Sequence, residues 1–243
     1  MNKKRYIILL LTLFVAMLVS AQGYKRKPTL NLQQSDQQRL HFGFALGLNF
    51  PDFSVRNKGY IAEDGTAMFA ETTGFIPGFT VGVISDLRLC EGLNLRFVPT
   101  LYFGERRVNF VDSNTGKLIE DEGNPVSMKS TYVYFPFYLK YSAFRHLNHK
   151  PYLIAGGGPA IDCTRKKGEL LLLKSFDVFV EVGVGWTFYL KYFRFSPEFK
   201  FCLGTLNMNE KNRTDLLDPS QCKFTNTISK LTSRLFVFTF NFE

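Results

Sequence analysis

The residues of this sequence that could do chemistry are mainly charged side chains, placed at alternate positions of apolar segments. They are Arg96, Lys140, Asp177, Glu181, Arg194, Glu198, Lys200 and Arg234. Successive side chains of a β-strand point to opposite faces, so charges at alternate positions share one face of a sheet. On such a face, acids and bases can neutralise each other or form a path for protons or ions.

The other candidates for catalysis are weak. His146 and His149 have no serine or carboxylate at motif spacing, and His41 is the one histidine expected on a strand. Residues 156–158 are three glycines, but they lead into Pro159 and not into a helix with Lys-Ser/Thr, as a phosphate-binding loop would. We therefore predict that the protein is not an enzyme and has no catalytic residue, cofactor or metal site.

The composition of the chain excludes several classes of protein. Of 243 residues, 45% are hydrophobic, and the aromatic residues are 26 Phe, 11 Tyr and one Trp. A disordered chain is excluded, because this much apolar surface offsets the chain entropy that folding costs. A mean hydropathy near zero also excludes a bundle of membrane-spanning helices. Thirty Lys+Arg against 21 Asp+Glu give the chain a net charge of +9.

Residues 1–21 have the pattern of a signal peptide. Lys3, Lys4 and Arg5 precede an apolar stretch at 6–19, and the small residues Ser20 and Ala21 predict cleavage before Gln22. The alternative is an uncleaved anchor, but the stretch is 14 residues long and a spanning helix needs about 20. We expect an exported protein.

Residues 22–40 form a polar lead with a basic stretch at 25–27. We interpret it as a flexible periplasmic segment; the alternative is an arm that docks on a periplasmic partner or on anionic lipid.

The four cysteines do not suggest a metal site, because the sequence has no C-x-x-C pair. Export to an oxidising compartment makes one disulfide possible, with Cys163 and Cys222 as the candidate pair, since both fall in expected loops. Cys202 is expected near the outer end of a strand and Cys90 in a turn.

Apolar residues alternate with small or polar ones in eight segments of residues 41–243. From His41 to Phe50, for example, the even positions are Phe, Phe, Leu, Leu and Phe, and the odd ones are His, Gly, Ala, Gly and Asn. A period of two predicts strands and not helices. The segments are 41–50, 75–83, 93–103, 131–140, 151–160, 176–188, 193–203 and 234–242.

The outward face of these strands decides the class of fold. A narrow soluble barrel could not hold phenylalanine at nearly every interior level, whereas lipid would accept an apolar exterior. Strands in lipid must close, because open edges leave backbone groups unsatisfied. Residues 41–243 are therefore predicted to form an eight-stranded antiparallel up-and-down β-barrel that spans the outer membrane.

Loop lengths agree with this fold. Short turns near 87–92, 142–149 and 190–192 alternate with long connections. The long ones lie near 51–74, 105–128, 161–175 and 205–231. Outer-membrane barrels have short periplasmic turns and long extracellular loops, so both termini are expected in the periplasm.

Two features fit less well. Pro77, Pro99, Pro136 and Pro197 each remove a backbone donor, so we expect strand ends or bulges at these positions. In the last segment, the large apolar side chains of Leu235 and Val237 have the inward phase.

The charges on the inward face are predicted to fill the barrel. An eight-stranded barrel holds little more than its own side chains, and a lone charge inside it would be costly. We expect Asp177 near Arg234 toward the outer end, and Glu181 beside Lys200. A proton or ion path through the barrel is the alternative.

Several motifs resemble one family. Residues 132–141 (YVYFPFYLKY) and 151–159 (PYLIAGGGP) are similar to the small outer-membrane barrels of the PorT family of Bacteroidota, as are 176–178 (FDV), 182–185 (VGVG) and 197–200 (PEFK). The resemblance covers essentially the whole mature chain. It implies a required component of the type IX secretion system, which exports proteases and adhesins with a C-terminal sorting domain.

A barrel this narrow cannot pass folded cargo, so the resemblance implies an accessory or assembly role. The implied partners are outer-membrane lipid and other secretion components, with no nucleic acid and no small-molecule substrate. The alternative is a structural or adhesive barrel that acts through its extracellular loops.

Overall fold

The computed structural model describes residues 29–59, 65, 67–72, 74, 76–113, 116–119, 126–164, 171–211 and 222–243. The predicted signal peptide and the beginning of the lead lie outside these residues. The chain divides into two units, Met1–Leu30 and Asn31–Glu243. The fold described below is that of the second unit.

The described residues of this unit form an antiparallel sheet with two short helical segments, η1 (Ser35–Gln37) and α2 (Cys222–Thr227). The strands of the described residues are β1 (Leu40–Asn57), β2 (Met68–Thr72), β3 (Gly78–Cys90), β4 (Leu93–Phe97), β5 (Thr100–Asp112), β6 (Val126–Tyr134), β7 (Phe137–Ser142), β8 (His149–Asp162), β9 (Phe176–Tyr189), β10 (Arg194–Gly204) and β11 (Ile228–Phe242).

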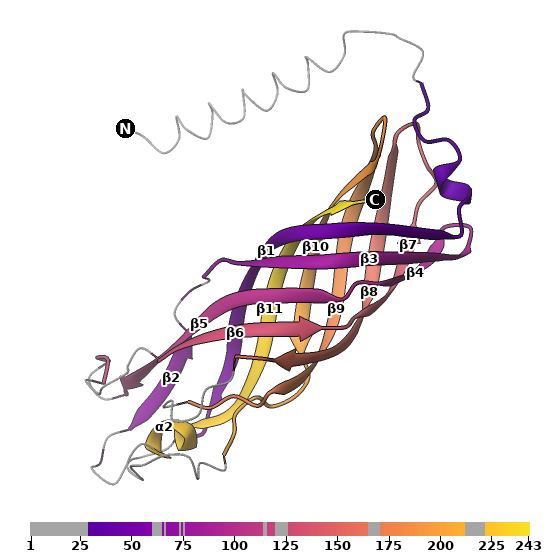
Figure 1. The fold of residues 1–243 in the computed structure, drawn as a ribbon. Coiled ribbons are helices and arrows are strands. Elements are labelled where there is room, and N and C mark those ends of the chain that lie inside the picture. The colour runs from indigo at the N-terminus through magenta and orange to yellow at the C-terminus, as the bar shows by residue number, and fades with distance from the viewer. Residues whose placement is uncertain are drawn as a thin grey trace, which may run out of the picture. The chain divides into compact units, whose positions relative to one another are not determined.

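The strand pairings lead around the sheet and return to their starting strand. β1 pairs with β3, which pairs with both β4 and β5; these pair with β7 and β6, and both of those pair with β8. β8 pairs with β9, β9 with β10, β10 with β11, and β11 with β1 (Figure 1). With β4 and β5 as one interrupted strand, and β6 and β7 as another, the pairing follows the eight predicted segments.

Proline explains both interruptions. Pro99 separates β4 from β5, and Pro136 separates β6 from β7, because proline has no N–H to donate to a ladder. Pro77 directly precedes β3, again as predicted. Pro197 is an exception: it lies inside β10, opposite Phe240 of β11, so the expectation of a strand end or bulge there is wrong.

The two faces of the strands differ as the alternation predicts. In β1, His41, Ala45 and Asn49 are buried, whereas Phe42 is 67% exposed. Across the outer surface, aromatic rings of neighbouring strands stack, as Phe44 and Phe242 do with centroids 4.9 Å apart. This apolar exterior matches a lipid environment better than water.

The interior contains buried apolar clusters as well as polar side chains. Leu235 and Val237 point inward, as their phase predicts, and pack in a buried cluster. The other members of the cluster are Tyr102, Tyr132, Tyr134, Ala160, Phe179 and Cys202. The inward phase of the last strand is therefore consistent along its length.

The strands extend beyond the predicted ends on the side of the long loops. β1 continues to Asn57, β5 to Asp112, and β2 pairs with β5 inside the segment expected to be a loop. A second buried cluster forms there. Its members are Phe53, Met68, Ala70, Val108, Phe110, Val126, Met128, Leu171, Leu173, Met208, Phe224, Ile228 and Leu231. We call this region the loop cap; β2 and α2 lie within it (Figure 1).

Among the described residues, no helix combines the length and apolar character that a membrane span requires.

Candidate functional site

The candidate site is the polar interior of the barrel, together with its opening at the end where the turns are short. In the interior, four cations and four carboxylates of the described residues form one network of ion pairs. The cations are Arg96, Lys140, Arg194 and Lys200, and the carboxylates are Asp86, Glu181, Glu198 and Glu243. Formal charge in this network is balanced, which keeps the cost of burial low.

Arg96 is the centre of the layer nearest the short turns. Its guanidinium contacts Asp86 at 2.7 Å and Glu198 at 3.6 Å, and also binds Glu243. Lys140 lies 3.5 Å from Asp86, and Arg194 lies 2.7 Å from Glu243. The inward phase of β3, β4, β7 and β10 brings these side chains together.

Lys200 is the centre of the next layer. Its ammonium lies 3.2 Å from Glu198 and 4.0 Å from Glu181, so the predicted pair with Glu181 is present, although Glu198 is closer. Tyr152 donates a hydrogen bond of 2.7 Å to Glu198, and Tyr138 donates one to Glu181. The tyrosine rings occupy the space between the ion pairs.

Arg234 does not lie in the interior. It has the outward phase of Phe236 and Phe238, its side chain is 41% exposed, and its Nε donates a 2.8 Å hydrogen bond to Asp52. The predicted pair of Arg234 with Asp177 is therefore wrong. Asp177 is buried and accepts hydrogen bonds from the backbone N–H groups of Val178 and Leu206.

The sequence reasoning missed Asp86, Glu243 and Arg106. Asp86 and Glu243 continue the inward phase of β3 and β11 beyond the segments expected to be strands. Extending the alternation past the expected strand ends would have identified both residues. Arg106 is buried between the rings of Phe53 and Tyr132, at 4.6 and 5.1 Å, and donates to the Tyr132 hydroxyl. Arg106 has the same inward phase on β5 as the buried Tyr102, and this alternation could have identified it.

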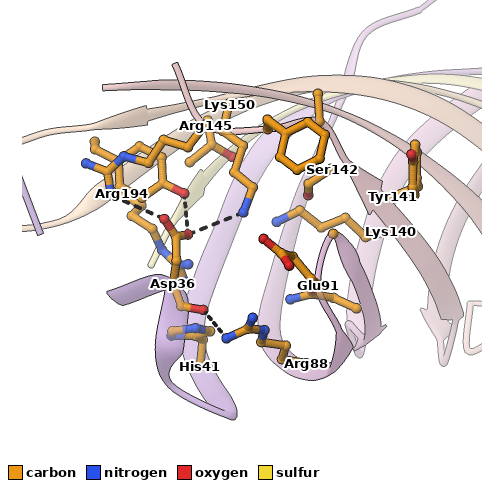
Figure 2. Close-up of a pocket in the computed structure, with 16 residues that line it drawn as sticks. Asp36, His41, Arg88, Glu91, Lys140, Tyr141, Ser142, Arg145, Lys150 and Arg194 are labelled. Carbon is orange, nitrogen blue, oxygen red and sulfur yellow. Dashed lines mark hydrogen bonds and ion pairs between the residues drawn. The ribbon is translucent and has the colours of Figure 1, made fainter. Parts of the chain in front are cut away.

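A pocket of about 300 Å³ opens at the end of the short turns, and we call it the mouth. Figure 2 shows its charged lining. The charged residues and the histidine are Asp36, His41, Arg88, Glu91, Lys140, Arg145, Lys150 and Arg194. Two of the cations, Lys140 and Arg194, belong to the interior network, so the mouth and the interior are continuous.

Residues 31–38 lie at the mouth, and we call this segment the strap. Its Asp36 accepts a hydrogen bond of 2.6 Å from the Tyr189 hydroxyl and lies 3.2 Å from Arg145 and 3.4 Å from Lys150. Burial raises the pKa of the Asp36 carboxyl, but the hydrogen bond from Tyr189 and the nearby cations outweigh it and hold the pKa below its ordinary value of 3.8.

The histidines and cysteines are dispersed. His41 lies opposite Asp86, whose oxygens bind Arg96, Lys140 and Asn94. His149 begins β8 and was expected in a turn; it forms a bridge with His146. Among the described residues, no three His, Cys, Asp or Glu side chains are grouped to hold a metal ion.

Cys163 is exposed directly after β8, Cys90 is exposed at the end of β3, and Cys202 is buried. The side chain of Cys222 lies outside the described residues, so the disulfide between Cys163 and Cys222 stays a prediction.

The family described as "Outer membrane protein beta-barrel domain" matches residues 32–208 of the chain. No curated protein sequence matches it.

Solved structures of similar fold come from several bacteria. Neisserial surface protein A has a TM-score of 0.41 at 10% identity, over 84% of this chain and 98% of that one. OprG from Pseudomonas aeruginosa has a TM-score of 0.45 at 12% identity, over 84% of this chain and 94% of that one. The protease OmpT from Escherichia coli has a TM-score of 0.41 at 11% identity, over 91% of this chain and 98% of that one.

Proposed function

The chain belongs to the outer-membrane β-barrel family, and from this premise we propose that it is a non-enzymatic accessory component of a protein secretion machinery. The observation that carries the proposal is the filled interior. Arg96, Lys200 and the rings of Tyr138 and Tyr152 occupy the barrel where cargo would have to pass. The protein then acts through its surfaces and not through a channel.

The machinery that we propose is the type IX secretion system. The support for it is the resemblance of 132–141, 151–159 and 197–200 to the PorT family. In this role the barrel assembles, stabilises or gates a larger translocon. The protein touches lipid with its outer aromatic face and other secretion components with its two ends.

We also propose that the short turns and the strap face the periplasm. Long loops of outer-membrane barrels are extracellular, which puts the loop cap outside the cell. The mouth, with Asp36 and Arg145, then faces periplasmic partners.

Deletion of the gene in the native host tests the role. We expect proteins with a C-terminal sorting domain to accumulate in the periplasm and to disappear from the medium, as measured by immunoblot. Complementation with the wild type should restore export, and the other secretion components should stay at normal levels. Unchanged export in the deletion strain would contradict the proposal.

The alternative is an adhesive barrel that acts through its loop cap. The observation that favours it is the buried cluster around Phe53, Phe110 and Phe224, because a packed core holds the cap surface in one shape. In this case, deletion reduces attachment of cells to surfaces or host molecules, and sorting-domain proteins are still exported.

A further inference from the structure

The mouth already holds a carboxylate from its own chain. Asp36 of the strap receives a hydroxyl hydrogen bond from Tyr189 and lies within ion-pair distance of Arg145 and Lys150. These three side chains come from the end of β9, the β7–β8 turn and the start of β8. Figure 2 shows Arg145 and Lys150 on one side of Asp36, and Arg88 on the other. The site therefore binds one carboxylate with a hydroxyl group and two cations.

The same side chains also contact the main chain of the strap. Arg88 donates a 2.7 Å hydrogen bond to the backbone carbonyl of Asp36, and Arg145 donates to the carbonyls of Leu32 and Asn31. The backbone N–H of Asn31 donates to the Asn148 side chain at 3.0 Å, and the Asn31 amide donates to the carbonyl of Tyr189 at 3.0 Å. The mouth thus recognises peptide groups as well as a carboxylate.

The strap is held weakly for a segment with so many contacts. None of residues 31–38 is buried, and the only helical turn in it, η1, is three residues long without a side-chain cap. Its contacts are polar and lie beside water, where each adds little stability. A competing ligand therefore has little buried apolar surface to displace.

Charge at the rim favours an anionic competitor. Lys140 and Arg194 are matched by carboxylates of the interior. Without Asp36, the remaining charged residues of the lining are Arg88, Arg145 and Lys150 against Glu91, an excess of two positive charges. The open space of about 300 Å³ beside Asp36 leaves room for further side chains of a ligand.

We propose that the mouth is a binding site for an acidic peptide segment of a partner protein, and that the strap is its resident occupant, displaced when the partner binds. A peptide fits better than a lipid headgroup, because the mouth contacts backbone carbonyls and the Asn31 amide in addition to the carboxylate. The site does not depend on the secretion role.

A peptide-binding assay with the full chain in detergent micelles tests the site. The probe is a fluorescein-labelled peptide of the strap itself, residues 31–38 (NLQQSDQQ). A covalently attached strap acts at an effective concentration in the millimolar range, so the wild type should bind the free peptide poorly. The variant N31A/D36N weakens the resident strap, and we expect it to bind the peptide at least tenfold more tightly than the wild type.

Two controls examine the recognition itself. Adding Lys150→Ala or Tyr189→Phe to the opened variant should weaken binding about tenfold, and so should replacing aspartate by asparagine in the peptide. A second peptide that keeps only the asparagine and the aspartate, with alanine at the other positions, should still bind. Fluorescence of Trp186, which lies on the outer face of β9, verifies that each variant is folded.

The proposal is overturned if the opened variant does not bind the peptide, or if it binds the asparagine peptide equally well. A lipid ligand is examined with nanodiscs that contain phosphatidylglycerol or only phosphatidylcholine. Peptide binding that is present in micelles and in neutral nanodiscs but lost in the anionic nanodiscs would assign the mouth to lipid headgroups instead.

Discussion

Asp86 and Arg96 lie directly opposite each other on β3 and β4, and Nε and Nη2 of the arginine both reach the same carboxylate oxygen, at 2.8 and 2.7 Å. Strand register sets this pair, because residues opposite each other on one face have adjacent side chains. The same arginine contacts Glu198 and Glu243, so one side chain connects β3, β4 and β10 with the residue that follows β11.

Removing one partner of this pair should be costly. We expect Arg96→Met to destabilise the barrel by about 3–5 kcal/mol, because it leaves buried carboxylates without their cation. The double variant R96M/D86N should lose less than the sum of the two single losses. Urea unfolding in lipid vesicles, followed by Trp186 fluorescence, measures the free energies of unfolding.

The matched control is the exposed pair of Glu105 and Arg107, 2.8 Å apart. Glu105→Gln should lower the free energy of unfolding by less than about 1 kcal/mol, because solvent screens this pair. Equal losses at the buried and exposed pairs would contradict the description of a buried network.

Gly185 allows Tyr152 to cross the interior. The two residues are opposite each other on β9 and β8, and a Cβ atom at 185 would overlap the tyrosine ring. We expect Gly185→Ala to cost about 1–3 kcal/mol through overpacking, measured by the same unfolding assay. Tyr152→Phe, which removes the hydrogen bond to Glu198 without a change in ring position, should cost less. A neutral effect of Gly185→Ala would show that the ring has room to move.

The filled interior predicts that the barrel does not conduct ions. Four cations and four carboxylates are paired across it, and the tyrosine rings lie between the pairs. The purified protein in planar lipid bilayers should give no steady conductance in 1 M KCl, under conditions in which a porin gives clear steps. Steady steps from the wild type would favour the alternative of an ion path.

The alternation of residues in the sequence was sufficient for the fold but not for every contact in the site. It assigned Phe42 to the outside and Arg96, Glu198 and Lys200 to the interior, because a period of two determines the face of a strand. Partners within the face depend on register and strand length. The pairs of Arg234 with Asp52 and of Arg96 with Asp86 follow from register, which no local pattern in the sequence specifies.

The strap and the loop cap were harder to predict for a different reason. Asn31 and Asp36 are in a polar segment without periodicity, and their partners Arg145 and Tyr189 are more than 100 residues away in the chain. In the cap, Phe53, Phe110 and Phe224 come from three connections, and their shared core forms only when the barrel brings those connections together.

The strap should detach in acid. The pKa of Asp36 is lower in the folded protein than its ordinary value of 3.8, so its contribution to stability is present above about pH 4 and is lost as the pH falls through the folded pKa. A nitroxide attached at the exposed position of Gln37→Cys, with Cys90, Cys163 and Cys222 replaced by serine, should be restricted at pH 7 and gain mobility below about pH 4 in EPR spectra.

Asp36→Asn is the control for this experiment, because its label should be mobile at both pH values. The side chains of Glu91 and His41 also line the mouth, and they are unchanged in this variant. A pH-dependent label in Asp36→Asn would attribute the effect to one of them and contradict the prediction.

The loop cap should unfold independently of the barrel. The rings of Phe110 and Phe224 meet edge to face with centroids 4.7 Å apart in a buried cluster, and a Phe→Ala change in a core costs about 3–5 kcal/mol. We expect Phe110→Ala to increase thermolysin cleavage at the loop end by about 100-fold or more, since 1.4 kcal/mol corresponds to a factor of ten. The urea midpoint measured by Trp186 fluorescence should change little, because Trp186 lies on the barrel wall.

Phe144→Ala, at a position 87% exposed in the β7–β8 turn, is the matched control and should change neither readout. If Phe110→Ala reduces protease resistance and also lowers the urea midpoint measured by Trp186 fluorescence, then cap and barrel unfold as one unit.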